Sequence, residues 1–204
     1  MGVFITFEGI EASGKTTQIN LLYDYLKSIG KNVIKTREPG GTKIGQKIRE
    51  ILLSKWDEKF PYIAELLLYE ADRNIHIHNI IKPSLEAGYI VLSDRYIDST
   101  TAYQHYARGI DYEIVSYLNT LATDGLKPNL TFLIDIPVEI SLKRLSESKD
   151  RIESEDIEFH KKLREGFLKI AENEKDRFVV VDGTMDIMEI HKIIVDSLKQ
   201  RSII

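Results

Sequence analysis

The chain has 204 residues, with 28 basic and 32 acidic side chains and a formal net charge of −4 at pH 7. This length predicts a single domain over residues 1–204, and the absence of cysteine excludes disulfides and thiolate metal sites. The mixed charges argue against a nucleic-acid polymer as partner, and no apolar run approaches the ~18 residues of a membrane span. We expect a cytoplasmic protein, without a membrane anchor, that binds small molecules.

Five apolar runs suited to buried parallel strands recur along the chain, and stretches with helical periodicity separate them. The runs cover residues 3–7, 32–36, 89–93, 130–135 and 177–182. This alternation predicts an α/β fold in which a five-stranded parallel sheet carries helices on both faces. In such a sheet the ligand binds beyond the carboxyl ends of the strands. The segments that follow the strands are therefore the candidates for function.

The first apolar run leads directly into a G-x-x-x-x-G-K-[ST] motif, and a helical pattern follows the motif at once. The motif reads Gly9-Ile10-Glu11-Ala12-Ser13-Gly14-Lys15-Thr16. A strand, a glycine-rich turn and a helix start aim backbone N–H groups and the helix dipole at one point, where the phosphates of a nucleotide bind. We expect Lys15 to reach the β- and γ-phosphates and Thr16 to hold Mg²⁺. An ordinary strand-to-helix turn is the alternative, which the flanking strand and helix disfavour.

Charged turns follow the second and third apolar runs. Asp94 and Arg95 come directly after the run 89–93, where an acidic residue of a P-loop protein is placed to hold Mg²⁺ and an arginine to clamp a phosphate. A structural salt bridge is the alternative for this pair. Residues 37–42, Arg-Glu-Pro-Gly-Gly-Thr, form a glycine-bearing turn at the same predicted sheet edge. By itself this second turn indicates only a change of chain direction.

The segment 146–156 is the one break in composition, polar and charged between two helical patterns. A solvated loop is the default interpretation of such a segment. In a P-loop protein we interpret it as a lid that closes over the phosphates.

Several motifs together resemble the thymidylate kinase family, in its order and spacing, from about residue 3 to residue 184. They are residues 7–17, 37–42, 66–73, 94–96 with 99–104, and 150–153. The resemblance implies a nucleoside monophosphate kinase-like P-loop fold and an enzyme that transfers the γ-phosphoryl group of ATP to dTMP, giving dTDP for dTTP synthesis. It also implies that ATP contacts Gly9, Ile10, Glu11, Ala12, Ser13, Gly14, Lys15, Thr16 and Thr17.

The resemblance implies that Tyr69 stacks on the thymine base and that Arg73 hydrogen-bonds it. Residues four apart share one helix face, so one helix presents both side chains to the same ligand. The alternatives are core packing for Tyr69 and a surface ion pair for Arg73. Phe is usual in the family where this chain has Tyr69, and we expect stacking to survive the added hydroxyl.

Charged contacts with dTMP follow from the same resemblance. Arg95 is expected to hold the phosphate of dTMP, with Arg37 as a helper. Glu11 stands where the family has an acidic residue, more often Asp, near the metal and the sugar of the acceptor. The longer side chain of Glu11 leaves its exact contact open.

A second stretch that matches the acceptor site of the family lies just after the 94–96 turn. Thr100, Tyr103 and Gln104 match positions that line the base and the sugar of dTMP. Capping of a helix is the alternative for this stretch, because Asp98, Ser99 and Thr100 are all good N-cap residues.

On the donor side, Arg151 of the lid matches an arginine that approaches the transferring phosphoryl group in family members whose P-loop lacks one. Ala12 stands at that P-loop position, so this chain resembles the lid-arginine type. Arg144 lies where the family stacks an arginine on adenine. Asp182 belongs to a turn, 181–184, that resembles the loop at the adenine edge.

We expect catalysis to rest on positioning and charge stabilisation, because the anionic phosphate of dTMP attacks without a general base. The catalytic side chains are then Lys15, Arg95 and Arg151, acting with Mg²⁺. The family is usually homodimeric, and the apolar helix faces between residues 44 and 83 are candidates for a subunit interface, although they also suit a core.

Two rival functions remain open at the level of sequence. A kinase for another nucleoside monophosphate, or for a deoxynucleoside with Glu38 as carboxylate base, is the nearer rival. The turn 37–42 and the pair of Tyr69 and Arg73 argue against it. A P-loop nucleotide switch is disfavoured because the chain lacks the guanine-specifying Asn/Thr-Lys-x-Asp motif.

Overall fold

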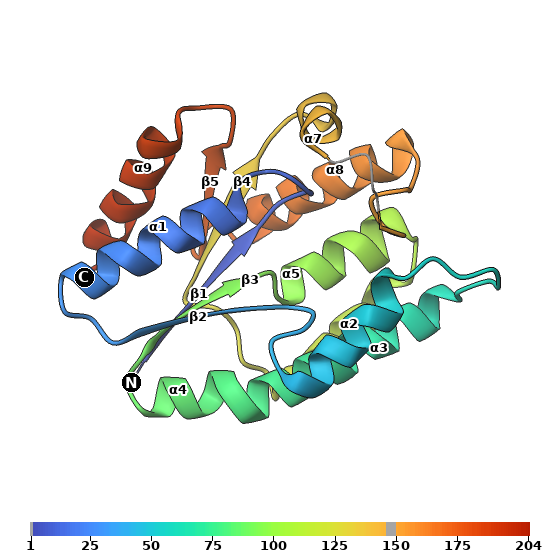
Figure 1. The fold of residues 1–204 in the computed structure, drawn as a ribbon, viewed down its shortest axis with the longest axis horizontal. Coiled ribbons are helices and arrows are strands. Elements are labelled where there is room, and N and C mark those ends of the chain that lie inside the picture. The colour runs from blue at the N-terminus through green and yellow to red at the C-terminus, as the bar shows by residue number, and fades with distance from the viewer. Residues whose placement is uncertain (1, 146–149) are drawn as a thin grey trace.

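A parallel sheet forms the centre of the molecule. The computed structural model describes residues 2–145 and 150–204. Its strands are β1 (Val3–Glu8), β2 (Val33–Arg37), β3 (Ile90–Asp94), β4 (Leu130–Asp135) and β5 (Phe178–Asp182). They pair in the order β2-β3-β1-β4-β5 (Figure 1). Each predicted strand is present within one residue of its predicted bounds, which confirms the α/β fold with a five-stranded parallel sheet.

Helices connect the strands and cover the sheet. They are α1 (Lys15–Ser28), α2 (Lys43–Leu53), α3 (Tyr62–His76), α4 (Lys82–Glu86), α5 (Ile97–Thr100), α6 (Tyr112–Thr123), α7 (Val138–Arg144), α8 (Ile157–Asn173) and α9 (Ile187–Gln200). Two π-helical segments, η1 (Ile77–Ile81) and η2 (Thr101–Ala107), continue α3 and α5 directly. Within residues 2–145 and 150–204, no helix has the length and apolar character to cross a membrane.

The strand side chains alternate between two apolar cores, one on each face of the sheet. Ile5 and Phe7 of β1 pack with α1 and α9 on one face. Phe4 points the other way and packs with Ile77 and Ile81 of η1, while α8 covers the same face beside β4. Because successive strand residues point to opposite faces, burial on both faces explains why the strands read as continuous apolar runs.

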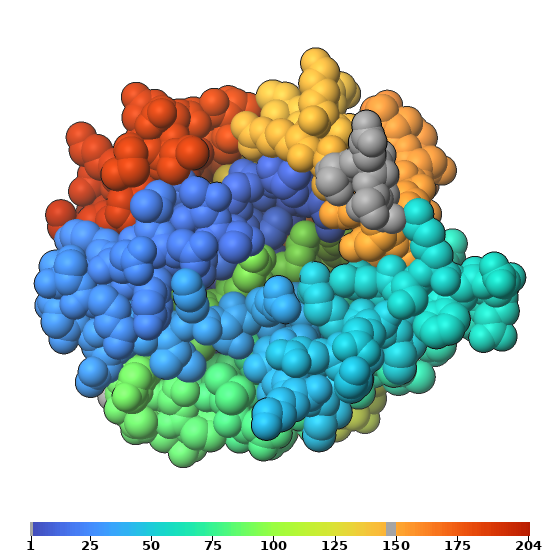
Figure 2. Space-filling model, viewed as in Figure 1, coloured from blue at the N-terminus to red at the C-terminus, as the bar shows by residue number. Residues whose placement is uncertain are grey.

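The sheet topology creates a crevice at the carboxyl end of β1. The chain leaves β1 through the P-loop into α1, while β3 and β4 flank β1 on its two sides. In the register of the sheet, Asp94 at the end of β3 pairs with Phe7 of β1 on one side and with Arg37 of β2 on the other. Figure 2 shows the surface hollowed here, between α1 in blue and α2 and α3 in cyan, with the green β3–α5 segment below. A ligand site is expected at such a switch point.

Candidate active site

The P-loop is a tight turn that only particular residues can form. Gly9 and Gly14 have φ values of 139° and 103°, a region open to glycine. A Cβ at Gly9 would also lie 2.5 Å from the carbonyl oxygen of Ile134. Ala12 adopts φ 54°, so this non-glycine residue also holds a left-handed backbone. The loop is therefore wound closely enough to leave its N–H groups facing one point.

Lys15 is folded back over the P-loop. Its ammonium donates to the carbonyl oxygens of Gly9, at 3.0 Å, and Ile10, at 2.8 Å. Burial and, to a lesser extent, the neighbouring charge of Arg95 together lower the pKa of Lys15 to about 8, against the opposing pull of Asp94. The pKa falls because this ammonium has no carboxylate in contact to compensate for its lost hydration. An anionic phosphate at this place would supply that compensation.

Thr16 and Asp94 meet at the opening of the P-loop. The Thr16 hydroxyl donates to Oδ2 of Asp94 at 2.9 Å. Together with Arg37 and Gly41 they line a cavity of about 350 Å³ beside the loop. Hydroxyl and carboxylate oxygens are the ligands that Mg²⁺ takes from proteins, so the donor set at this point fits the predicted ion.

A second cavity, of about 150 Å³, lies between the P-loop, α3 and the α5–η2 helix. Every predicted acceptor residue except Arg37 lines it: Glu11, Tyr69, Arg73, Arg95, Thr100, Tyr103 and Gln104. Arg37 lines the neighbouring cavity with Thr16 and Asp94 instead. The structure therefore brings together side chains from four separate segments of the chain, as the resemblance requires.

Arg73 is fixed inside a buried hydrogen-bond network. Its guanidinium donates to Glu38 at 2.8 Å, to Glu70 at 2.8 Å, to Thr100 at 2.8 Å and to Asn119 at 3.0 Å. Only 2% of the residue is exposed, so a surface ion pair is the wrong interpretation. Burial opposes the charge of Arg73, but Glu70 and Glu38 outweigh burial and raise its pKa. Arg73 is thus a fixed cation at the inner end of the cavity.

Glu38, the carboxylate considered above as a base, is committed to structure. One oxygen accepts from Nε of Arg73 at 2.8 Å, and the other lies 2.9 Å from Nδ1 of His76. Burial opposes ionisation of Glu38, but Arg73 and His76 prevail and lower its pKa. A carboxylate with both oxygens occupied and a lowered pKa is poorly suited to abstract a proton.

Arg95 holds a strained backbone and reaches across the P-loop. Its φ is 73°, and its guanidinium donates to the Gly9 carbonyl oxygen, to Ser99 and to Oε1 of Glu11, each at 3.0 Å. Tyr103 donates to the same oxygen of Glu11. The carboxylate that pairs with Arg95 is therefore Glu11, so the predicted alternative of an Asp94–Arg95 salt bridge is wrong.

The capping alternative for residues 98–100 is also wrong. No side chain caps α5, whose N-cap residue is Tyr96. Asp98 forms an ion pair with Arg177 instead, at 2.7 Å, and Ser99 donates to Glu8 at 2.6 Å. These polar side chains are turned into the protein because Glu8 of β1, Arg73 of α3 and Arg177, directly before β5, supply partners for them.

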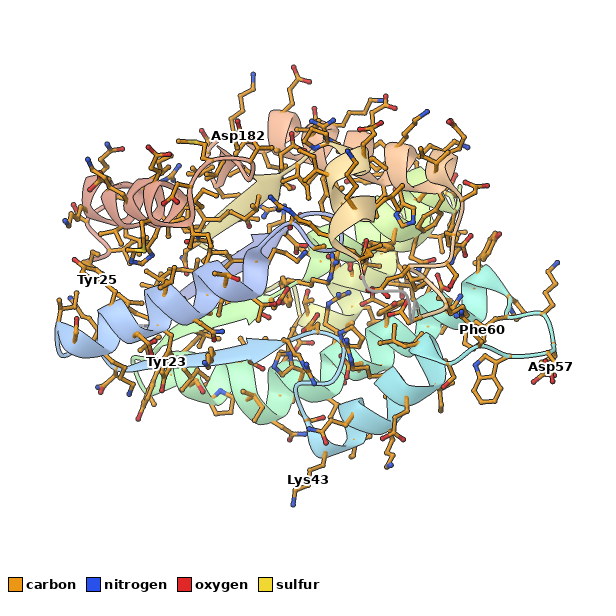
Figure 3. The ribbon with its side chains drawn as sticks, turned by 45° about the horizontal axis from the view of Figure 1, so that its top comes forward. Tyr23, Tyr25, Lys43, Asp57, Phe60 and Asp182 are labelled. Atoms are coloured by element: carbon orange, nitrogen blue, oxygen red, sulfur yellow. The ribbon has the colours of Figure 1, made fainter. Side chains whose placement is uncertain are left out.

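Arg151 lies at the acceptor side of the structure. Nη2 is 2.5 Å from Oε2 of Glu65, Nε donates to the Leu52 carbonyl oxygen at 2.9 Å, and the guanidinium covers the Phe60 ring. Figure 3 shows Phe60 on the loop between α2 and α3, which projects from the body with Asp57 near its tip. Residues 146–149 of the predicted lid lie outside the described part of the chain. The approach of Arg151 to a transferring phosphoryl group stays a prediction.

The predicted adenine-side residues lie at the other side of the P-loop. Arg144, exposed at the end of α7, donates to the Ala12 carbonyl oxygen at 3.3 Å. Asp182, at the end of β5 (Figure 3), accepts from the backbone N–H of Thr184 at 2.8 Å. Ser141 adds a contact that the sequence did not indicate, donating to the Glu11 carbonyl oxygen at 2.7 Å. Helix α7 therefore braces the P-loop from the donor side.

Arg49 is an acceptor-cavity residue that the sequence reasoning missed. It lines the cavity with Tyr69 and Arg95 and donates to the Pro39 carbonyl oxygen at 3.1 Å. Burial lowers its pKa, and Arg37 adds to that lowering, which indicates a place short of negative charge. The local sequence carries no signal for this role, because Arg49 reads as one more charged residue on an amphipathic helix.

Comparison with known proteins places this geometry in a family. The model of the thymidylate kinase family matches residues 7–194. The chain belongs to that family. The thymidylate kinase of Sulfurihydrogenibium sp. (strain YO3AOP1) is 96% identical over the full length of both chains. That of Geotalea uraniireducens (strain Rf4) is 49% identical, covering 93% of this chain and 92% of the relative.

A solved thymidylate kinase has the same fold. The crystal structure of the enzyme from Ehrlichia chaffeensis matches with a TM-score of 0.80 at 39% identity, covering 97% of this chain and 98% of that one. The predicted thymidylate kinase family and its nucleoside monophosphate kinase-like fold are thereby confirmed, and with them the ATP-dependent phosphorylation of dTMP to dTDP.

Proposed function

We propose that the two neighbouring cavities divide the dTMP kinase reaction between donor and acceptor. ATP binds along the P-loop, residues 9–17, with Arg144 and Asp182 toward its base, and dTMP binds in the cavity under α3. The observation that carries this division is the reach of Arg95. Its guanidinium contacts the Gly9 carbonyl oxygen of the P-loop while lining the cavity of Tyr69 and Arg73. A phosphate clamped by Arg95 would therefore lie beside the donor phosphates.

Within the acceptor cavity, the residues divide by chemistry. Tyr69 stacks on the base and Arg73 hydrogen-bonds it, while Arg95 and Arg49 hold the phosphate. Thr100, Tyr103 and Gln104 complete the wall, and Oε1 of Gln104 is buried without a partner among the described atoms, which leaves an acceptor for a ligand N–H. Arg37, expected from the resemblance to help Arg95 at the phosphate of dTMP, lines the adjoining cavity with Thr16 and Asp94. We therefore assign Arg37 to the donor phosphates or the metal instead.

The proposed mechanism needs no general base, because the phosphate oxygen of dTMP is already anionic near neutral pH. Positioning and charge stabilisation then carry the catalysis. Lys15 exchanges its contacts with the Gly9 and Ile10 carbonyl oxygens for the donor phosphates. Arg95 exchanges Glu11 for the acceptor phosphate, which frees Glu11 to face the sugar or the metal shell.

Thr16 and Asp94 would hold Mg²⁺, since their oxygens already lie within 2.9 Å of each other at the mouth of the P-loop. When bound with ATP, the ion supplies neutralisation of charge on the phosphate oxygens. The chain's own part is to keep these two oxygen ligands in place at the end of β3 and the start of α1.

The single domain of residues 1–204 includes the segment 146–156 as its lid, with Arg151 as the arginine that stabilises the transferring group. Lid closure would exclude water, which otherwise competes with dTMP for the phosphoryl group. Strong ATP hydrolysis in the absence of dTMP would count against a closing lid.

We also propose a homodimer formed through α2, α3 and α6, in a cytoplasmic enzyme. Helices α2 and α6 both pack on α3, and the three present exposed apolar side chains: Ile44, Ile51, Ile63, Leu67, Ile114, Tyr117 and Leu121. An apolar surface of this kind, rimmed by polar residues, is typical of protein–protein contacts. The predicted faces between residues 44 and 83 are part of it, and α6 extends it.

The proposed acceptor site is tested by substrate range. The purified chain is assayed for ADP release with ATP, Mg²⁺ and, in parallel, dTMP, dUMP, dCMP, dAMP or thymidine. We expect dTMP to give the highest kcat/KM and thymidine to give no turnover. Preference for thymidine would overturn the arrangement proposed here, because a neutral hydroxyl requires a base that Glu38, with both oxygens occupied, does not supply.

A further inference from the structure

Glu8 is a fully buried carboxylate to which neither the sequence analysis nor the mechanism above gives a role. It ends β1, directly before the P-loop, and none of its surface is exposed. One oxygen accepts from the backbone N–H of Tyr96 at 2.8 Å, and the other accepts from the Ser99 hydroxyl at 2.6 Å. Both partners belong to the segment that carries Arg95.

Arg95 needs such support because its own backbone conformation is unfavourable. A non-glycine residue at φ 73° is strained and persists only where its neighbours hold it. The Phe7 carbonyl oxygen accepts from the backbone N–H of Arg95 at 3.0 Å. Glu8 fixes the next peptide through Tyr96, so β1 holds the turn on both sides of the strained residue.

The side chain of Arg95 is tied to Glu8 as well. The hydroxyl of Ser99 accepts from Nη1 of Arg95 at 3.0 Å while it donates to Glu8. Because one hydroxyl serves both bonds, the carboxylate sets the direction of the Ser99 hydroxyl and thereby that of the guanidinium. Glu8 thus acts on Arg95 through the backbone and through one side chain.

We propose that Glu8 is a positioning residue for the acceptor reaction, which aims the Arg95 guanidinium at the phosphate of dTMP. This inference rests on the proposed role of Arg95 as the phosphate clamp. Strand β1 then leads into the P-loop, which binds the donor phosphates, and also supports Arg95, which binds the acceptor phosphate. The position of β1 therefore sets the distance between the two phosphates.

The hydrogen-bonding role of Glu8 does not depend on its negative charge. Burial raises the pKa of Glu8 to about 8, with the charge of nearby Asp98 adding to the effect. A neutral amide of the same shape can take its place, accepting from Tyr96 through its oxygen and donating through its nitrogen to the Ser99 hydroxyl oxygen, which still accepts from Arg95. Alanine removes both contacts, so Glu8→Gln and Glu8→Ala separate loss of hydrogen bonding from loss of charge.

A double-mutant cycle on dTMP binding tests the proposal. Calorimetry gives the dissociation constant of dTMP for the wild-type chain, Glu8→Ala, Arg95→Ala and the double variant. We expect Glu8→Ala to weaken dTMP binding about tenfold or more, Glu8→Gln to stay close to wild type, and Glu8→Ala to add nothing in the Arg95→Ala background. Binding of an ATP analogue is the internal control and should change little.

Equal weakening by Glu8→Ala with and without Arg95 would overturn the proposal, because it would show that Glu8 acts on the fold in general. If Glu8→Ala does not fold, as judged by circular dichroism, Ser99→Ala takes its place in the cycle, since it removes the middle of the relay. Failure of the clamp itself gives a different result: Arg95→Ala would then bind dTMP as tightly as wild type.

Discussion

The guanidinium of Arg151 forms an ion pair with the buried carboxylate of Glu65, with 2.5 Å between Nη2 and Oε2. The same carboxylate accepts from Gln104 at 2.7 Å and pairs with Arg108, so three side chains share it. Glu65 lies one turn before Tyr69 on α3. The proposed lid arginine is therefore held beside the acceptor cavity, and it must leave Glu65 to reach a phosphoryl group at the P-loop.

This relationship predicts a fluorescence signal from Trp56, the single tryptophan of the chain. Trp56 is half-exposed and lines one surface cavity together with Phe60 and Arg151. Departure of Arg151 from Phe60 should change the environment of the indole. We expect the Trp56 emission to change when dTMP and a non-hydrolysable ATP analogue bind together, and to change less with either nucleotide alone.

Arg151→Ala serves as the control for that signal, because it lacks the side chain that moves. Its response to the two nucleotides should be much smaller than that of the wild-type chain. An unchanged Trp56 spectrum in the wild-type ternary complex, with occupancy verified by calorimetry, would mean that Arg151 stays on Glu65.

Arg151→Ala should also lower kcat by about 10³, the scale of an arginine that stabilises a transferring phosphoryl group. The KM for dTMP should change far less, because Arg151 does not line the acceptor cavity. Steady-state kinetics measure both, with Arg201→Ala as the matched control, since Arg201 is exposed and its side chain makes one hydrogen bond among the described residues, to the Asp176 carbonyl oxygen. Turnover at the wild-type rate would remove Arg151 from the mechanism.

Tyr69→Phe and Tyr69→Ala should behave differently toward dTMP. Stacking of a base on an aromatic ring is worth about 1–3 kcal/mol, so Tyr69→Ala should raise the KM for dTMP by roughly tenfold or more. Tyr69→Phe keeps the ring and should stay near wild type, because no hydrogen bond of the Tyr69 hydroxyl is seen among the described residues. Similar losses in both variants would assign the hydroxyl, rather than the ring, to dTMP binding.

The sequence alone predicts the strands and part of the candidate site. Periodicity located the strands and the P-loop motif located Lys15 and Thr16, because both are local patterns with a direct physical cause. Arg95 was singled out by its place directly after a strand, Tyr69 and Arg73 by family resemblance, and the three line one cavity.

The roles of other residues depend on contacts in the folded protein that no local sequence pattern predicts. Glu8 reads as the last residue of a strand, and only the fold brings it to Tyr96 and Ser99, about ninety positions away. Arg49 reads as one more charge on an amphipathic helix. The same applies to α6, since an apolar stripe on a helix does not tell a core from a subunit interface.

The proposed dimer predicts that Leu121→Glu yields monomers. Leu121 on α6 is 58% exposed, and a charge within the proposed apolar interface would be buried without a partner. Sedimentation velocity should show a dimer for the wild-type chain and a monomer for Leu121→Glu. Ile29→Glu is the matched control, since Ile29 is a comparably exposed apolar residue at the end of α1, outside the proposed interface. A wild-type monomer at micromolar concentration would contradict the proposal.

Asp72, which lies beneath the turn 37–42, should make the stability of the fold depend on pH. Only 1% of Asp72 is exposed, one oxygen accepts from the Gly40 backbone N–H at 3.1 Å, and burial, reinforced by Glu38, raises its pKa to about 6. Between about pH 4 and pH 6, folded Asp72 therefore keeps a proton that the unfolded chain has released. Its contribution to stability falls as pH rises through this window, by up to about 3 kcal/mol.

The asparagine of Asp72→Asn does not titrate, so this variant should lack the pH-dependent contribution of Asp72 to stability. Urea unfolding at several pH values between about 4 and 7 measures it, as the free energy of unfolding of the variant minus that of the wild-type chain. That difference should move in favour of Asp72→Asn as pH rises, whatever constant offset the new amide introduces. Asp124→Asn is the control, because the hydrogen bond from Lys82 lowers the pKa of Asp124. Asp124 therefore titrates below this pH range, and the difference for Asp124→Asn should stay nearly constant across it. A difference for Asp72→Asn that stays constant with pH would show that Asp72 ionises as readily in the folded protein as in the unfolded chain.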